Sequence, residues 1–203
     1  MARSSRRLLI LSLLAAWLAA PGAAAASSTE EARATVQGVV DAVLGVLRTP
    51  ELPSAERRTR IEAIAYDWFD FETMSRLVVA RGWRRFTAEQ KQTFVTEFRE
   101  LLAARYGRKL DSYGQEDVAV EQARQDAGGD VTVRTRIVRP GAGEVAVDYR
   151  LRNEGGRWKA IDVVIEGVSL VFSYRGQFQD ILASKGPEGL IERVRQKNVG
   201  PVD

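Results

Sequence analysis

The first part of the chain alternates hydrophobic and polar positions with the period of an α-helix. Between Ala32 and Leu47 the hydrophobic residues recur every three or four positions, which places them on one side of a helix. Pro50 and Pro53 follow, and the first helix ends before them because proline interrupts helical hydrogen bonding. Ser54 is a favoured N-cap residue and predicts the start of a second helix. The buried side of this second helix consists of Ile61, Ile64, Ala65 and Trp68.

Two further helices are predicted from their N-terminal capping residues. Asp70 is a suitable N-cap for a short helix that Gly82 ends. The buried side of this short helix carries Phe71, Met74, Leu77 and Val78. The segment Thr87–Gln90 has the form of a capping box, in which the first and last side chains each bond the other residue's backbone amide. It opens a long helix with a wide aromatic face made of Phe94, Phe98, Leu101, Leu102, Tyr106, Leu110 and Tyr113.

Beyond Gly114 the hydrophobic period changes to two, which is typical of half-buried β-strands. Four strands are predicted, at 118–120, 131–137, 145–151 and 158–165. Short turns between successive strands indicate an antiparallel meander with one buried face. After residues 168–172 a helix carries Phe178, Ile181 and Leu182, and Gly186-Pro187 separates it from a last helix. This order predicts a single α+β domain, in which N-terminal and C-terminal helices pack on a four-stranded antiparallel sheet.

The N-terminus has the composition of a secretory signal peptide. Arg3, Arg6 and Arg7 precede an apolar run over 8–20, which a Pro-Gly turn and the small residues Ala23–Ala26 follow. The run is too short for a bilayer core of about 30 Å, which needs roughly 20 residues. We therefore expect a signal peptide over residues 1–26, cleaved near Ala25 or Ala26, and a mature periplasmic domain over 27–203.

Composition narrows the classes of function that remain. Without the three signal arginines the mature chain carries 27 cations and 27 anions, so no excess positive charge favours nucleic acid. The chain contains neither cysteine nor histidine, which excludes disulfides, thiolate nucleophiles, histidine bases and cysteine or histidine metal sites. We expect a non-enzymatic protein with no cofactor, no metal and no catalytic residue. Near-neutral charge and the lack of a heptad repeat favour a monomer.

Several carboxylates allow a catalytic interpretation and a structural one. Asp67, Asp70 and Glu72 lie close in the sequence and have the residue types of an acid/base pair. The structural interpretation, which we favour, makes Asp70 a helix cap and Glu72 a partner of the helix dipole. Asp162 and Glu166, at the end of the last strand, are expected to hold the following loop through backbone amides.

Two groups of residues resemble the MlaC family, also called the toluene-tolerance family, of periplasmic lipid-binding proteins. The first group comprises Phe69-Asp70-Phe71, Ser75–Val78, Gly82-Trp83, Phe98-Arg99, Leu101-Leu102 and Tyr106-Gly107. The second group comprises Trp158–Asp162, Glu166–Ser169, Tyr174-Arg175 and Phe178. The resemblance covers essentially the whole mature chain in the family's order of elements.

The resemblance implies a cradle of helices and sheet that takes phospholipid tails into an apolar cavity. It also implies that the protein moves lipid between an outer-membrane lipoprotein–porin complex and an inner-membrane ABC transporter. From the sequence alone, the aromatic helix and the sheet could equally enclose a solid core. The lining expected for the cavity consists of Leu77, Val78, Phe94, Phe98, Leu101, Leu102, Tyr106, Val147, Tyr149, Val163, Ile165, Val168, Leu170, Tyr174 and Phe178.

Alternatives remain open at this point. A hopanoid or another polycyclic lipid would fit the same lining, and an adaptor of the transport complex would need no cavity. An isomerase or hydratase would need a polar group deep inside, and no inward acid is evident in the pattern. Arg175, beside Tyr174, either contacts a lipid phosphate or pairs with a carboxylate. Trp83, beside Arg84 and Arg85, either contacts a membrane or partner or fills the core.

Overall fold

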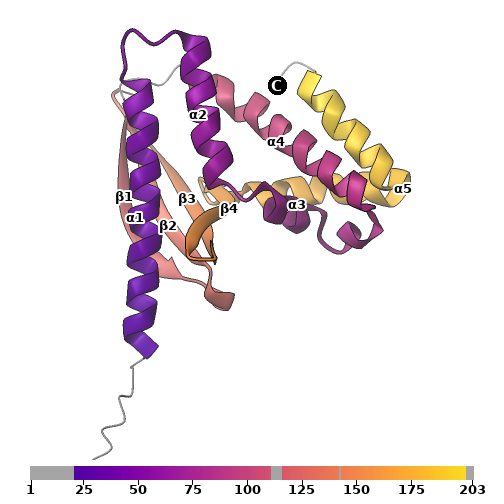
Figure 1. The fold of residues 1–203 in the computed structure, drawn as a ribbon, viewed down its shortest axis with the longest axis horizontal. Coiled ribbons are helices and arrows are strands. Elements are labelled where there is room, and N and C mark those ends of the chain that lie inside the picture. The colour runs from indigo at the N-terminus through magenta and orange to yellow at the C-terminus, as the bar shows by residue number, and fades with distance from the viewer. Residues whose placement is uncertain (1–20, 111–115, 142, 200–203) are drawn as a thin grey trace, which may run out of the picture.

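The computed structural model describes residues 21–110, 116–141 and 143–199. The N-terminal half is helical: α1 (Pro21–Leu47), α2 (Ser54–Trp68), α3 (Phe71–Val79), the 3₁₀ helix η1 (Ala80–Arg85) and α4 (Ala88–Leu110). The remainder contains β1 (Asp117–Gln125), the short 3₁₀ helix η2 (Ala127–Gly129), β2 (Val131–Arg139), β3 (Gly143–Glu154), β4 (Arg157–Ile165), β5 (Val168–Ser169) and α5 (Leu170–Val199). Figure 1 shows the helices gathered around one side of the sheet. Residues 1–20 of the expected signal peptide, and Tyr113, lie outside the described residues.

The sheet is an antiparallel meander in which every strand pairs with its neighbours in the sequence, in the order β1-β2-β3-β4-β5. The expected α+β class is confirmed, with one correction, because the sheet has five strands rather than four. The additional strand β5 is only two residues long, and Val168 pairs with Ile165. Val168–Ser169 was expected to be part of the segment leading into the last helices. The turn at Glu166-Gly167 is tight enough to return the chain alongside β4, since both residues have positive φ angles.

Helix α1 covers the buried face of the sheet. It packs mainly on β1 and also on β2 and β4. Figure 1 shows α1 running across the sheet beside β1 and β2. The buried residues between them form a first core, which we call the sheet cluster. Its members are Ala32, Val36, Val40, Trp68, Val131, Val133, Leu151, Trp158 and Ala160. The three-to-four spacing in α1 and the alternation in β2 and β3 therefore predict the correct buried faces.

The aromatic helix α4 packs mainly on α5, and also on α3 and α2. The residues buried there form a second core, which we call the helical cluster. Its members are Met74, Val78, Val79, Phe86, Phe94, Phe98, Leu101, Leu102, Val171, Tyr174, Phe178, Leu182, Leu190, Ile191 and Val194. The expectation that the aromatic face of α4 lies against the sheet is not met, because α1 occupies that face and α3 and α5 supply the apolar surface that α4 buries. Periodicity identifies the buried side of a helix without identifying its partner.

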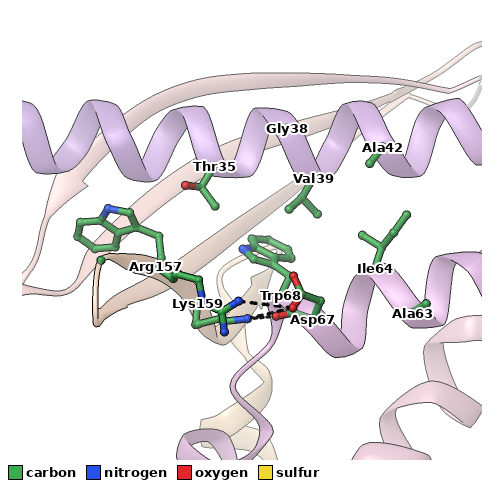
Figure 2. A pocket seen from close by; sticks show the side chains of 12 residues that line it. Thr35, Gly38, Val39, Ala42, Ala63, Ile64, Asp67, Trp68, Arg157 and Lys159 are labelled. Atoms are coloured by element: carbon green, nitrogen blue, oxygen red, sulfur yellow. Dashed lines mark hydrogen bonds and ion pairs between the residues drawn. The ribbon is translucent and has the colours of Figure 1, made fainter.

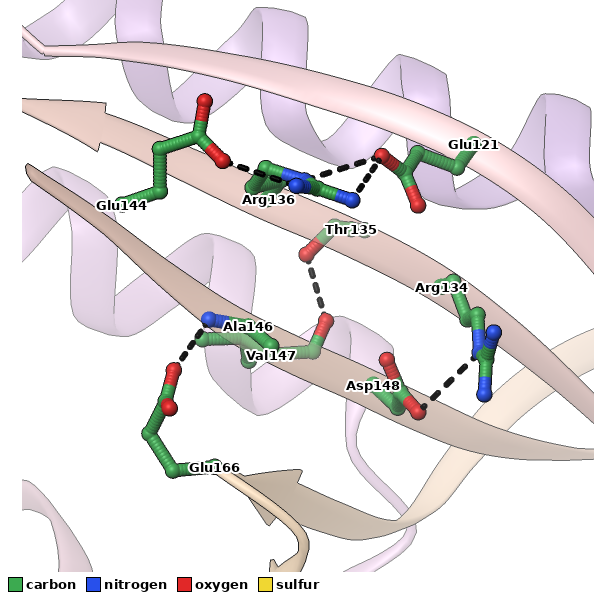
Figure 3. Close-up of polar contacts among 9 residues, drawn as sticks. All are labelled: Glu121, Arg134, Thr135, Arg136, Glu144, Ala146, Val147, Asp148 and Glu166. Carbon is green, nitrogen blue, oxygen red and sulfur yellow. Dashed lines mark hydrogen bonds and ion pairs between the residues drawn. The ribbon is translucent and has the colours of Figure 1, made fainter.

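The opposite face of the sheet is charged. Arg136 pairs with Glu144 at 2.7 Å and with Glu121 at 2.9 Å, and Arg134 lies 3.8 Å from Asp148 (Figure 3). Near the other end of β2 and β3, Asp130 accepts from Arg152 and Arg150, each at 2.8 Å, and is only 1% exposed. This face follows the alternation of the sequence, in which charged residues occupy the outward positions of β2 and β3.

Helix α5 changes direction at Gly186, whose φ of +65° is not helical. The chain then continues through Pro187 and returns along α4, so the last segment lies beside α4 in Figure 1. The expected break at Gly186-Pro187 is confirmed. The break allows both halves of α5 to contribute to the helical cluster, which contains Phe178 from the first half and Leu190 from the second.

Candidate functional site

Nine of the fifteen residues expected to line a cavity lie together in or against the helical cluster. Phe94, Phe98, Phe178 and Tyr174 form its aromatic centre, and each is at most 3% exposed. The rings of Phe94 and Phe98 are stacked with centroids 5.8 Å apart, and Tyr174 meets Phe98 edge-on at 5.3 Å. The other five residues are Leu77, Val78, Leu101, Leu102 and Tyr106. Interlocked aromatic rings of this kind make a dense core.

The six residues expected from the sheet side are placed differently. Val147 and Val163 are buried, and Tyr149 packs against the sheet cluster. Ile165 and Leu170 are half-buried, whereas Val168 is 58% exposed. The structure therefore brings the helical residues together and Val147, Tyr149 and Val163 to the buried face of the sheet, but it does not join the two groups into one continuous lining.

A run of aromatic residues at the junction of α2 and α3 connects the two clusters. We call Tyr66, Trp68, Phe69 and Phe71 the aromatic link. Phe69 packs against both clusters, and Trp68 lies 4.9 Å from the ring of Tyr149 on β3. Phe69 and Phe71 are 5.7 Å apart, and Tyr66 meets Phe71 edge-on at 5.9 Å. The aromatic link is thus the place where helices and sheet meet.

The position of the aromatic link is fixed by backbone contacts with β4. Phe69 forms a parallel bridge with Ala160, and the Asp70 amide donates to the Ala160 carbonyl at 2.9 Å. The Asp70 carboxylate accepts from the Thr73 amide at 2.8 Å and so caps α3. The structural interpretation of Asp70 is therefore confirmed. Sequence reasoning missed the aromatic link as part of the site, although four aromatic residues within six positions were a visible signal.

Two recesses lie on the surface of the described residues. The first, of about 700 Å³, lies between α1, α2 and the β3–β4 turn (Figure 2). Its walls are apolar at Val39, Ile64 and Trp68, and at one end Asp67 lies 3.6 Å from Lys159 and 3.8 Å from Arg157. The second, of about 500 Å³, lies between η1 and α5. Neither recess is lined by any of the fifteen expected residues.

Burial changes the pKa of two tyrosines in and beside the two clusters. Burial raises the pKa of Tyr149 to about 12, and burial together with the neighbouring Tyr106 raises the pKa of Tyr174 further. Both phenols therefore stay neutral near pH 7. At the surface, the negative charge of Asp70 raises the pKa of Glu154. Among the described residues, no group of three or more acidic side chains is placed to hold a metal ion.

Asp162 and Glu166 serve the backbone, as expected from the sequence. Asp162 is buried and accepts from the amides of Val163 at 2.8 Å and Val171 at 3.1 Å. The Ser169 hydroxyl donates to its other oxygen at 2.5 Å. Glu166 accepts from the Ala146 amide at 2.5 Å (Figure 3). The Asp162 contacts attach the start of α5 to the end of β4, and the Glu166 contact attaches the turn after β4 to β3.

The sequence left two interpretations open for Arg175 and two for Trp83, and the structure shows the contacts of both residues. The Arg175 guanidinium donates through Nε and Nη2 to the Leu77 carbonyl at 2.9 and 2.7 Å, and it has no carboxylate partner among the described residues. Trp83 packs against the helical cluster and stacks on Phe86 at 5.5 Å. It therefore belongs mostly to the core. In the described parts of the chain, no helix is both long enough and apolar enough to cross a bilayer.

Comparison with known proteins gives one family and several relatives. A family model described as MlaC protein matches residues 37–196. The toluene tolerance protein ttg2D of Pseudomonas putida is 31% identical over 103 residues, which is 51% of this chain and 48% of that protein. This match thus spans about half the length of the relative. The intermembrane phospholipid transport system binding protein MlaC of Haemophilus influenzae is 24% identical over 149 residues, 71% of this chain and 70% of that protein.

A solved structure shares the fold. It is that of the phospholipid-binding protein from Ralstonia solanacearum in complex with a phospholipid. The superposition has a TM-score of 0.75 at 29% sequence identity, and it covers 83% of this chain and 97% of that structure. The matched 83% of this chain is larger than the helical part or the sheet part alone, so the similarity extends through both the helices and the sheet.

Proposed function

Because the chain belongs to the MlaC protein family, we propose that it binds a membrane phospholipid by its acyl chains and carries it without altering it chemically. The observation that carries this proposal is the phospholipid bound to the Ralstonia solanacearum protein, whose fold matches this chain over most of its length. The name of the Haemophilus influenzae relative, a binding protein of an intermembrane phospholipid transport system, supports the same role.

The acyl chains are proposed to lie between the helical cluster and the sheet, along the residues expected from the sequence other than Val168, which is exposed. Two chains hold roughly 30 methylenes, whose exposure to water would cost on the order of 25 kcal/mol at about 0.8 kcal/mol each. A shallow surface groove cannot recover that free energy. Phe94 is fully buried and Phe98 is 1% exposed, so the tails cannot enter the helical cluster without displacing side chains.

Entry of the tails therefore requires the helices to move relative to the sheet. The aromatic link supports this step, because Phe69 is packed against both clusters and its neighbours Trp68 and Phe71 extend toward opposite sides. When the rings of the aromatic link separate, their apolar faces can pack on the methylenes of the acyl chains. The acyl chains then cover the apolar surface that the two clusters otherwise bury against each other. The aromatic link is proposed to open for the cargo.

A binding role without catalysis is consistent with the chemistry of the described residues. The buried carboxylates Asp130 and Asp162 are occupied by arginines and by backbone amides, respectively. Tyr149 and Tyr174 stay protonated near neutral pH. These groups stabilise the fold, and no proton transfer is assigned to them.

The setting of the protein follows from the same proposal. We propose that residues 1–26 direct export and are removed near Ala25 or Ala26, and that residues 27–203 act in the periplasm as a monomer. The carrier is proposed to collect lipid at one membrane complex and deliver it to another, namely an outer-membrane lipoprotein–porin complex and an inner-membrane ABC transporter.

The test is the lipid content of protein purified without detergent. Mass spectrometry of organic extracts is expected to find phospholipid in the wild-type protein. Leu101→Phe should reduce the amount per protein, since the larger side chain takes space from the acyl chains. Leu190→Phe is the matched control, because Leu190 is equally buried in the helical cluster but lies outside the expected lining. Each change should cost about 1–3 kcal/mol of stability through overpacking.

The outcomes of this test are distinct. If the extracts contained a polycyclic lipid in place of phospholipid, the proposed cargo would be wrong but the carrier role would stand. Extracts that contain no lipid in repeated preparations would contradict the proposal and favour an adaptor with a filled interior. Equal loss of lipid in both variants would show that lipid content follows stability rather than the expected lining.

A further inference from the structure

The second recess is built by the close approach of η1 to the first half of α5. Gly82 makes this approach possible, because a Cβ atom at this position would lie 2.1 Å from Cδ2 of Leu182. Ala80, shortly before Gly82 in η1, has a φ of +53°, a conformation that side chains rarely adopt. Backbone strain of this kind is often found where a surface is shaped for binding. We call the recess the arginine groove.

Three arginines line the arginine groove: Arg81, Arg85 and Arg175. Two of them are fixed by backbone carbonyls, since Arg175 donates to the carbonyl of Leu77 and Nη1 of Arg85 donates to that of Leu182 at 3.1 Å. Each guanidinium keeps N–H groups that these bonds do not use. Arg81 is exposed and makes no bond to another described residue.

No carboxylate compensates these charges within the described part of the chain. Among the other described arginines, most form an ion pair, as Arg136 does with Glu121 and Glu144. The three arginines of the groove form no ion pair with any described acidic residue. Its remaining polar side chain is the amide of Gln179. The arginine groove therefore attracts an anion, and planar guanidinium groups match the oxygens of a phosphate especially well.

Exposed apolar side chains lie beside the groove. Phe172 is 73% exposed and Val168 is 58% exposed, which makes them the two most exposed large hydrophobic residues of the described chain. Phe172, Arg175 and Gln179 follow one another at spacings of three and four residues in α5, so they lie on one side of that helix. Phe172 and Arg175 thus lie on one side of α5, and Val168, four residues before Phe172, lies in β5, which leads directly into this helix.

We propose that this surface, formed by the arginine groove with Phe172 and Val168, docks the protein directly on an anionic phospholipid bilayer. The guanidinium groups bind lipid phosphates, and the two apolar side chains enter the region between headgroups and acyl chains. A wholly acidic partner would match the arginines but would leave Phe172 and Val168 without an apolar counterpart. A bilayer surface provides both.

The expected attachment is weak and reversible. Each arginine near an anionic surface strengthens binding by about fivefold, and one partly inserted ring adds a similar or larger factor. Interfacial binding of this strength is too weak to anchor a protein permanently. A carrier that must leave the membrane again needs such an interaction. The inference goes beyond the proposed function, because it does not depend on where the acyl chains lie.

The test measures binding of the mature chain to lipid vesicles by flotation. Vesicles contain phosphatidylcholine alone or with about one-third phosphatidylglycerol. Wild-type protein is expected to bind the anionic vesicles more tightly and to be released as salt is raised. Arg81→Gln should weaken this binding about fivefold and the double variant Arg81→Gln with Arg85→Gln about 25-fold. Phe172→Ser should weaken binding to both kinds of vesicle.

Matched controls keep the result specific. Arg193→Gln removes an exposed arginine from the distal half of α5, and Val138→Ser removes an exposed hydrophobic residue from β2. Both should bind vesicles like the wild type, and circular dichroism should show that every variant is folded. Binding that ignores phosphatidylglycerol, or that Arg193→Gln weakens as much as Arg81→Gln does, would overturn the proposal. So would the absence of vesicle binding by the wild type.

The outcome is independent of the lipid-content test. Leu101→Phe should lose cargo and keep vesicle binding, whereas the double arginine variant should lose vesicle binding and keep cargo. Protein that binds anionic vesicles but never contains lipid would support this inference and contradict the carrier proposal.

Discussion

Individual buried charged residues stabilise the fold of this protein by accepting hydrogen bonds. Asp162 is 8% exposed and receives two backbone amides and one hydroxyl, so its negative charge is compensated at the start of α5. A buried carboxylate is tolerated only with such partners, because desolvation otherwise opposes ionisation. Asp162 thereby determines where β4 ends and α5 begins.

Replacing Asp162 should therefore destabilise the protein. Asp162→Ala removes the acceptor for three donors, of which the amides of Val163 and Val171 are buried, and should lower the free energy of unfolding by about 2–4 kcal/mol. Asp162→Asn keeps one acceptor oxygen and should cost less. Urea denaturation measures both, with Asp180→Ala on the exposed side of α5 as a control that should stay within about 0.5 kcal/mol of wild type. An unchanged free energy of unfolding in Asp162→Ala would contradict the stabilising role of this carboxylate.

Asp130 predicts a dependence of stability on pH. Burial raises the pKa of Asp130, but its hydrogen bonds and ion pairs with Arg152 and Arg150 outweigh burial and lower that pKa below the usual value. The folded protein then binds this proton less readily than the unfolded chain does. The stabilisation is present above about pH 4 and is lost as pH falls through the folded-state pKa.

The variant Asp130→Asn makes this dependence measurable. At neutral pH it should lower the free energy of unfolding by about 1–3 kcal/mol, since the arginine partners are partly solvated. The difference between wild type and variant should begin to shrink near pH 4, where the unfolded chain takes up the proton, and should continue to shrink as pH falls through the lowered pKa of the folded carboxyl. Asp117→Asn, an exposed partner of Arg48, is the control and should show little effect. If the stability difference between wild type and Asp130→Asn grew as pH fell, the predicted lowering of the Asp130 pKa would be contradicted.

At the scale of elements, capping residues determine where helices start. The predicted capping box of α4 is present: the Gln90 amide donates to the Thr87 hydroxyl, and the Thr87 amide donates to the Gln90 side chain, both at 3.1 Å. Asp70 caps α3 as predicted. The N-cap position of α2 is Pro53, which makes no side-chain bond, so Ser54 starts this helix from its first turn instead.

The capping box gives a prediction confined to one helix. Thr87→Ala should lower the free energy of unfolding by about 1 kcal/mol, because one amide of the first turn loses its acceptor. Thr87→Ser retains the hydroxyl and should restore most of that loss. Thermal unfolding followed by circular dichroism compares the two variants. An equal effect of alanine and serine would attribute the loss to the methyl group rather than to the cap.

The elements themselves were largely predictable, but two features depended on information that is absent from local patterns. The two-residue strand β5 forms only because Glu166-Gly167 returns the chain to β4, and two residues are too few to show alternation. The partner of α4 was mistaken because Phe94 and Phe98 would suit either a sheet or another helix. Tertiary packing, not periodicity, decides between them.

At the scale of the whole molecule, two apolar clusters meet at the aromatic link. The sequence predicted most residues of both clusters, since alternation and helical spacing mark them as buried. It did not predict that Tyr149 would lie with α1 and Trp68 rather than opposite Phe94, because the order of elements does not fix which helix covers the sheet. The position of the lipid within this arrangement stays a prediction.

Opening at the aromatic link predicts a spectroscopic change at Trp68. If lipid separates the clusters, the contact of Trp68 with Tyr149 and Phe69 must change when cargo binds. Residues 27–203 contain three tryptophans, so in a protein made of these residues, replacing Trp83 and Trp158 by phenylalanine leaves Trp68 as the only one. Its fluorescence emission should shift between lipid-loaded and lipid-depleted protein. In the matched variant that retains only Trp83, the emission should stay constant, and a shift confined to Trp83 would contradict opening at the aromatic link.

The pairing of each strand with its neighbours in the sequence affects the order in which parts of the protein fold. Each hairpin of the meander closes over a short loop, so the sheet can assemble from local contacts as soon as residues 117–165 are available. Helix α1 is different, because the Trp158 indole that meets Glu31 at 3.4 Å lies 127 positions away. The entropy of closing so large a loop delays that contact until the rest of the chain is in place. Helix α1 is therefore expected to dock last during folding, and to be among the first parts to detach when the native structure opens.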